Sequence, residues 1–123
     1  MSKFLNDAVL DAALDHAINN ADKMYLFDTY STDYATINAA KLAEVAVVGD
    51  DFTKANGDTS GRKAIVAAKA GVSVSADGNY NHIAIVKSTT STILAITDGT
   101  TKALNNGDTV DIPTFDIEVG DPA

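Results

Sequence analysis

The hydrophobic pattern along the chain changes its period near residue 22. Over residues 4–21 apolar side chains recur every three or four positions, which predicts an amphipathic helix. Beyond residue 22 apolar and polar residues tend to alternate, and Val, Ile and Thr replace Leu as the dominant larger side chains, which is typical of strands. The apolar stripe of the helix consists of Leu10, Leu14, Ala17, Ile18 and Ala21.

The helix is expected to begin after Asn6, whose side chain can accept a hydrogen bond from a free backbone N–H of the first turn. Its polar stripe is expected on the side opposite the apolar one. Such a helix either covers one face or end of the sheet or docks onto a neighbouring molecule. The polar stripe consists of Asp11, Asp15, Asn19 and Asp22.

Asn, Asp and Gly punctuate the second part of the chain and predict tight turns between strands. Residues 71–76 alternate cleanly, and residues 80–86 follow after a short Asp-Gly-Asn turn, so this pair is the best predicted hairpin. Residues 29–41 and 49–61 lack a pattern and are expected to be long loops. The predicted strands cover residues 24–28, 42–48, 62–69, 71–76, 80–87, 92–97, 101–104 and 110–119.

These strands follow one another with no helical pattern between them after residue 40, so no βαβ unit and no parallel nucleotide-binding sheet is expected. The predicted fold is mainly β, an antiparallel β-sandwich or barrel with one N-terminal amphipathic helix. Residues 1–22 would form the helix or arm, and residues 23–123 a single antiparallel β unit. No repeat or linker divides the chain.

Composition narrows the possible partners. The chain has 123 residues, enough for one domain, and a net charge of −8 from 17 acidic and 9 basic side chains. This balance argues against nucleic acid and anionic membrane as partners, because phosphates require clustered Lys and Arg.

The absence of Cys excludes disulfides, thiolate metal sites and Cys nucleophiles. Asp residues interrupt the N-terminal apolar positions, so no signal peptide is expected and synthesis in the cytoplasm is predicted.

The two histidines are the first candidates for chemistry. His82 lies in a predicted strand and His16 on the flank of the predicted helix. Metal or acid–base sites need further His, Cys or carboxylate partners at ligand spacing, and no HxH or HExxH motif occurs. Both are therefore interpreted as hydrogen-bonded structural residues.

Asp-rich turns are the second candidates, because oxygen ligands in Gly-containing loops suit calcium. None of these turns has the alternating ligands and terminal Glu of a twelve-residue calcium loop, so turn formation is the preferred interpretation. The turns are Asp50-Asp51, Asp98-Gly99 and Asn105-Asn106-Gly107-Asp108.

Asp116 and Glu118 are the third candidates, since they alternate with apolar residues and share one strand face, as the paired carboxylates of glycosidases must. The chain has no Trp to line a sugar cleft, so a solvated strand face is preferred. Residues 57–62 lack the Lys-Ser/Thr of a phosphate-binding loop and are interpreted as a polar loop. No catalytic, cofactor-binding or metal-binding residue is predicted.

Several stretches together resemble small virion structural proteins of tailed bacteriophages, of the kind that decorates capsids. They cover nearly the whole chain and contain no chemical motif, so the resemblance implies a location and no catalytic residue. They are FLND (4–7), VLDAAL (9–14), ADKM (21–24), LAEV (42–45), DFT (51–53), GDTSGRK (57–63), GVSV (71–74), HIAIV (82–86) and IPTFDIE (112–118).

The resemblance implies a non-enzymatic protein that binds the exterior of the assembled capsid, contacts the lattice of the major capsid protein and forms a homo-oligomer, with no cofactor. A head–tail connector, tail or fibre component is the alternative within the same particle. A glycan-binding β module is an alternative from another class.

Overall fold

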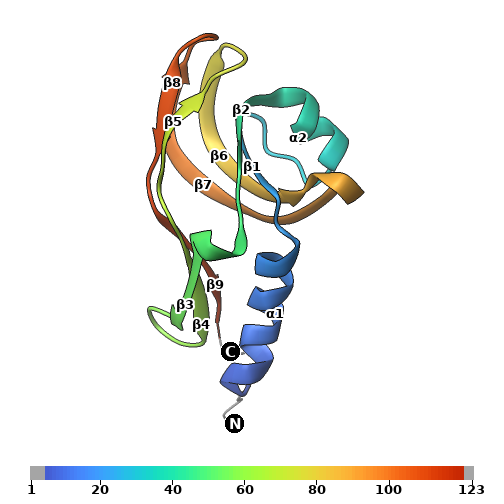
Figure 1. The fold of residues 1–123 in the computed structure, drawn as a ribbon, viewed down its shortest axis with the longest axis vertical. Helices are drawn as coiled ribbons and strands as arrows, with labels where there is room; N and C mark the ends of the chain where they lie inside the picture. Colours follow the sequence, from blue (N-terminus) through green and yellow to red (C-terminus); the bar gives the residue numbers. More distant parts are fainter. Residues whose placement is uncertain (1–4, 121–123) are drawn as a thin grey trace.

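The computed structural model describes residues 5–120 and confirms the mainly β, antiparallel architecture with an N-terminal helix (Figure 1). Phe4, where the predicted helix begins, and residues 121–123 of the predicted β unit lie outside the described residues. The helices are α1 (Asp7–Asn20), α2 (Tyr34–Ala40) and two 3-10 turns, η1 (Gly49–Asp51) and η2 (Ser88–Thr90). The strands are β1 (Lys23–Phe27), β2 (Lys41–Ala46), β3 (Phe52–Asn56), β4 (Arg62–Val66), β5 (Lys69–Ser73), β6 (Gly78–Lys87), β7 (Thr92–Leu104), β8 (Thr109–Ile112) and β9 (Phe115–Val119).

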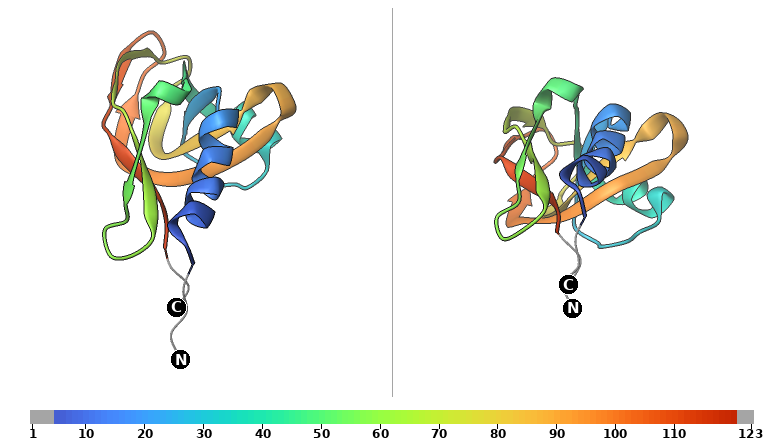
Figure 2. Two further views of the ribbon diagram at one scale, coloured as in Figure 1. Left: turned by 60° about the horizontal axis from the view of Figure 1, so that its bottom comes forward. Right: turned by 90° about the horizontal axis from the view of Figure 1, so that it is seen from below.

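Helix α1 begins as predicted, because the Asn6 side chain accepts a hydrogen bond of 2.8 Å from the backbone N–H of Ala8. Leu10 and Leu14 are buried, and the helix lies against β3, β4 and β9 (Figures 1 and 2). The sequence left open whether this helix covers the sheet or docks onto a neighbouring molecule. In the structure it covers part of the three-stranded sheet. Leu14 belongs to the main hydrophobic core.

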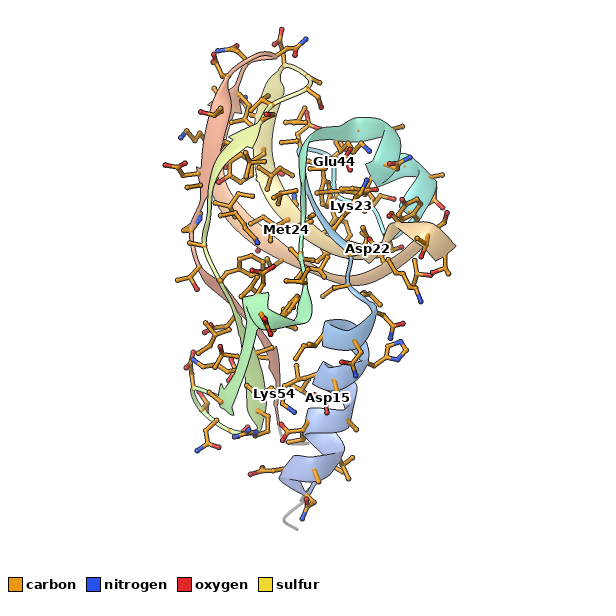
Figure 3. All side chains as sticks on the ribbon, viewed as in Figure 1. Asp15, Asp22, Lys23, Met24, Glu44 and Lys54 are labelled. Atoms are coloured by element: carbon orange, nitrogen blue, oxygen red, sulfur yellow. The ribbon has the colours of Figure 1, made fainter. Side chains whose placement is uncertain are left out.

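The predicted polar stripe of α1 is wrong in part, since Asn19 is exposed but Asp11 and Asp15 contact the sheet. Asp15 lies beside Lys54 of β3 at 2.7 Å (Figure 3), and Asp11 bonds Arg62 of β4. These carboxylates therefore lie on the flank of the helix that meets the sheet. Val9, an apolar residue, is 56% exposed instead.

Four strands form the largest sheet, in the order β2-β1-β6-β7, and all three pairings are antiparallel. Both faces of β1 are buried, which explains its uninterrupted run Met-Tyr-Leu-Phe. Met24 and Leu26 join the main core, whereas Tyr25 and Phe27 pack on the other face with Ile37 of α2. Helix α2 therefore covers the outer face of this sheet.

The opposite layer contains the three-stranded sheet β3-β4-β9 and the two-stranded sheet β5-β8, which lie along two long, interrupted chain segments. β4 pairs with β9, and β5, which follows β4, pairs with β8, which precedes β9. The break in the second long segment falls at Pro113, which cannot donate a backbone hydrogen bond. The Thr114 hydroxyl donates to the Val66 carbonyl at 2.6 Å beside the break. The predicted strands 62–69 and 110–119 are therefore each divided in two.

The predicted hairpin between residues 71–76 and 80–86 is wrong. β5 pairs with β8, while β6 pairs with β1 and β7. The segment after β5 is held by β2 instead, through the bridge between Ala43 and Val74 and a hydrogen bond of 2.8 Å from the Ser75 N–H to the Leu42 carbonyl. This contact joins the two layers along one side of the core.

The two predicted long loops are also wrong in part. Residues 29–41 contain α2, whose start is capped by Asp33, with its carboxylate accepting from the Thr36 N–H at 3.1 Å. Ile37 is its one buried residue, so no periodic pattern marks this short helix. Residues 49–61 contain β3, in which Phe52 alone is buried. Asp98-Gly99 was expected to be a turn, but it lies inside β7 at an irregularity of its pairing with β6.

Candidate functional site

The most distinctive feature of the surface is an open seam between β7 and β9. β7 is the last strand of the four-stranded sheet and β9 the last strand of the three-stranded sheet, so within residues 5–120 each pairs on one side only. Edge strands present unpaired N–H and C=O groups and are templates for another strand. The seam is therefore a place where the sheet structure is incomplete.

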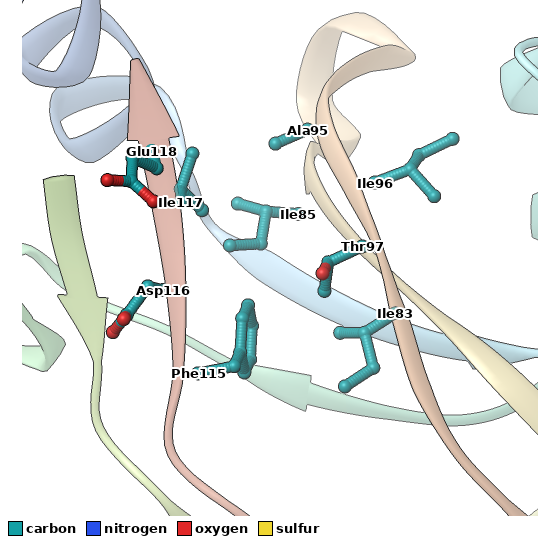
Figure 4. A pocket seen from close by; sticks show the side chains of 9 residues that line it. All are labelled: Ile83, Ile85, Ala95, Ile96, Thr97, Phe115, Asp116, Ile117 and Glu118. Atoms are coloured by element: carbon teal, nitrogen blue, oxygen red, sulfur yellow. The ribbon is translucent and has the colours of Figure 1, made fainter. Parts of the chain in front are cut away.

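A groove of about 210 Å³, lined by both apolar and polar groups, lies in this seam (Figure 4). Its floor comes from β6, where Ile83 and Ile85 are buried, and its walls come from the two edge strands. Figure 4 shows Phe115 and Thr97 facing each other across the opening. The lining residues are Ile83, Ile85, Ala95, Ile96, Thr97, Phe115, Asp116, Ile117 and Glu118.

Alternation along β9 places its charged side chains on the face away from the core. Phe115 and Ile117 pack against the main core, while the Asp116 carboxylate lies on the other side of the strand (Figure 4). Asp116 accepts from the Lys63 ammonium at 3.1 Å, and Glu118 accepts from the Asp58 backbone N–H at 2.6 Å. The rim of the groove is therefore polar, whereas the side chains on its floor are apolar.

The charge on this rim is negative. Lys63 bonds Asp58 at 2.7 Å as well as Asp116, and these hydrogen bonds hold the pKa of its ammonium above the usual value. Asp58, Asp116 and Glu118 carry three negative charges against the single positive charge of Lys63, a local balance of −2. Lys63 is thus already bonded to two carboxylates of this chain. The remaining negative charge of the rim favours the binding of a further cationic group.

The predicted pair Asp116 and Glu118 does share one strand face, and its carboxylates are engaged by a lysine and a backbone N–H. Neither carboxylate points into the groove in Figure 4.

His82 packs as an aromatic residue on the outer face of the four-stranded sheet. Its ring stacks on Phe27 with centroids 5.5 Å apart, and the Tyr30 ring lies at the same distance. Its Nδ1 is 2.6 Å from the Asn81 side-chain oxygen, and its Nε2 is 3.3 Å from an Asp98 oxygen. His16 is exposed on α1, and its carbonyl accepts from the Asn20 amide.

The Asp-containing turns use their carboxylates for local structure. Asp51 accepts from the Val48 N–H at 2.8 Å and bonds the Lys69 ammonium at 2.9 Å. Burial alone would raise the pKa of Asp51, but these partners hold it below its ordinary value. Asp77 accepts from the backbone N–H of Asn106 in the turn before β8. Across residues 5–120, no three His, Cys, Asp or Glu side chains lie close enough to hold a metal ion.

The loop of residues 57–61 closes the hairpin of β3 and β4. The Gly57 N–H donates to the Gly61 carbonyl at 2.9 Å, and Arg62 bonds Asp11 and Asn56. The Arg62 guanidinium therefore links this hairpin to α1.

Of the groove residues, the sequence singled out only Asp116 and Glu118, and it favoured a solvated strand face for them. The alternation of the apolar groove residues was visible, but the same pattern describes any core strand. Only the order of the strands reveals that β7 and β9 are edges.

No protein-family model, no curated protein and no solved structure matches this chain. Among the described residues, no helix has the length and apolar character needed to cross a membrane.

Proposed function

We propose that this protein is a non-enzymatic structural protein of a tailed bacteriophage virion that binds the exterior of the assembled capsid and stabilises it. The observation that carries the proposal is the groove between two edge strands, with an apolar floor and a polar rim, a surface suited to binding another polypeptide. The resemblance of the sequence to capsid decoration proteins supports the same role.

The charge distribution supports binding through apolar contacts and strand edges. A net charge of −8 makes copies of this chain repel each other, so dense packing on a lattice needs contacts that do not depend on attraction between unlike charges. In this proposal the protein acts as a homo-oligomer on the major capsid protein lattice. Several weak contacts per oligomer then add up to strong binding.

The test is co-sedimentation of the purified protein with procapsids, expanded capsids and tails of the phage that encodes it. We expect binding to expanded capsids, and a higher disruption temperature of capsids at saturating protein, because a ligand of the intact lattice stabilises it by mass action. Binding should persist or strengthen as salt screens the repulsion between copies. An acidic protein of the same size serves as the control.

Binding to tails alone would favour the connector or tail alternative. Binding that collapses with rising salt, or an unchanged disruption temperature at saturation, would contradict the stabilising role.

A further inference from the structure

We infer that the groove between β7 and β9 receives an extended segment of the capsid subunit, which adds as a β-strand between the two edges. Its inward side chains are apolar and its outward side chains are Lys or Arg. That the inserted segment comes from the capsid subunit rests on the proposed function. That a strand is added at all rests on the structure of the groove and its two edge strands.

The backbone provides the first argument. Successive antiparallel pairings lead from β7 through β6, β1 and β2 to the bridge with the segment after β5, and then to β8, which continues into β9. Each antiparallel pairing along this path reverses the strand direction, and the path contains five of them. β7 and β9 therefore run in opposite directions. A strand inserted between them therefore pairs parallel with one edge and antiparallel with the other, and it satisfies unpaired groups on both.

The groove provides the second argument. Successive side chains of a strand point to opposite faces, so every second residue of the inserted segment would face the groove floor. That floor is formed by Ile83 and Ile85, with Phe115 and Ile117 on the wall. Apolar side chains at alternate positions fit this surface, and their burial drives binding.

The charge of the rim provides the third argument. The remaining side chains of the inserted strand would lie beside those of β9 on its outer face, where Asp116 and Glu118 are found. The local balance of −2 favours Lys or Arg at these positions. The same balance, with the net charge of −8, disfavours a second copy of this chain as the occupant.

A peptide experiment tests the strand addition without capsids. The probe is an acetylated and amidated peptide of alternating Val and Lys, and the matched control is the peptide of alternating Val and Glu. We expect the Val–Lys peptide to slow amide hydrogen exchange at least fivefold in both β7 and β9, with the Val–Glu peptide binding at least tenfold more weakly. Equal binding of the two peptides, protection of only one edge, or no protection of either would overturn the inference.

A labelling experiment tests the same groove on capsids. The chain has no Cys, so Thr97→Cys introduces one thiol in the groove, and Thr53→Cys introduces one at an exposed position of β3 as the control. Alkylation with a bulky maleimide should weaken capsid binding of Thr97→Cys at least tenfold and leave that of Thr53→Cys unchanged.

The outcomes separate the two proposals. If both labelled proteins bind capsids equally well, the groove is not the docking site, although capsid binding stands. If the unmodified protein binds no capsid, the proposed function fails, and the peptide experiment alone decides whether the groove accepts a strand.

Discussion

Arg62 donates from Nε to Asp11 Oδ1 at 2.8 Å, across 51 residues of sequence. The bond ties α1 to β4, and both side chains are about four-fifths shielded from solvent. The hydrogen bond to Asp11 raises the pKa of the Arg62 guanidinium above its usual value. The pair fixes the helix beside the hairpin that leads to the rim of the groove.

This pair should be coupled in a double-mutant cycle with Asp11→Asn and Arg62→Met. We expect a favourable coupling free energy at low salt, which decreases with added salt because screening weakens an incompletely buried pair. Urea unfolding of the four proteins measures it. Strictly additive effects at low salt would show that the contact contributes nothing to stability.

Leu14 should contribute far more to stability than Val9, five positions earlier on the same helix. Leu14 is 2% exposed and belongs to the main core, whereas Val9 is 56% exposed. Leu14→Ala is expected to lower the free energy of unfolding by about 2–5 kcal/mol, because it leaves a cavity. Val9→Ala is expected to change it by less than about 0.5 kcal/mol. Chemical denaturation checks both, and a cost for Leu14→Ala as small as that for Val9→Ala would mean that α1 is not part of the core.

Asp22 should make stability depend on pH. Burial alone would raise the pKa of its carboxyl, but hydrogen bonds from the Ser88 N–H (2.9 Å and 3.1 Å) and hydroxyl (3.1 Å) hold it below its ordinary value. A carboxyl with a lowered folded-state pKa stabilises the protein above its unfolded-state pKa, and this stabilisation is lost as the pH falls through the folded-state value.

The variant Asp22→Asn should therefore be less stable than the parent by about 1–2 kcal/mol at neutral pH, with the difference shrinking below about pH 4. Unfolding measured across a pH series tests this, with exposed Asp50→Asn as the control. A difference that stays constant down to the lowest pH would rule out the charge of Asp22 as its cause.

Gly61 and Gly71 should differ in their tolerance of alanine. Both have left-handed backbone angles, with φ of 71° and 66°. A Cβ on Gly61 would overlap the Val119 carbonyl oxygen, whereas a Cβ on Gly71 meets nothing within 4 Å. Gly71→Ala should cost about 1–2 kcal/mol from backbone strain alone.

Gly61→Ala should cost clearly more than Gly71→Ala, because the end of β9 must also move. Thermal unfolding compares the two variants. An equal loss of stability in the two variants would mean that the close approach of the hairpin loop to β9 does not contribute to the cost of Gly61→Ala.

The sequence alone determined the local features of this protein. The change of period near residue 22 located α1 and the start of the sheet, Asn6 was predicted as the helix cap, and the alternation of residues 71–76 placed Val72 and Val74 inward. These features follow from backbone geometry, since 3.6 residues per turn and a two-residue repeat fix which side chains share a face.

The tertiary structure decided which strands meet. The alternation of β5 suited pairing with β6 as well as with β8, and the bridge from Val74 to Ala43 helps hold the segment after β5 beside β2. The ion pair of Asp11 with Arg62 and the groove beside Phe115 likewise depend on segments far apart in the sequence. A periodic pattern states which face of a strand is apolar, but the pairing energy that selects its neighbour comes from contacts that exist only once the chain has folded.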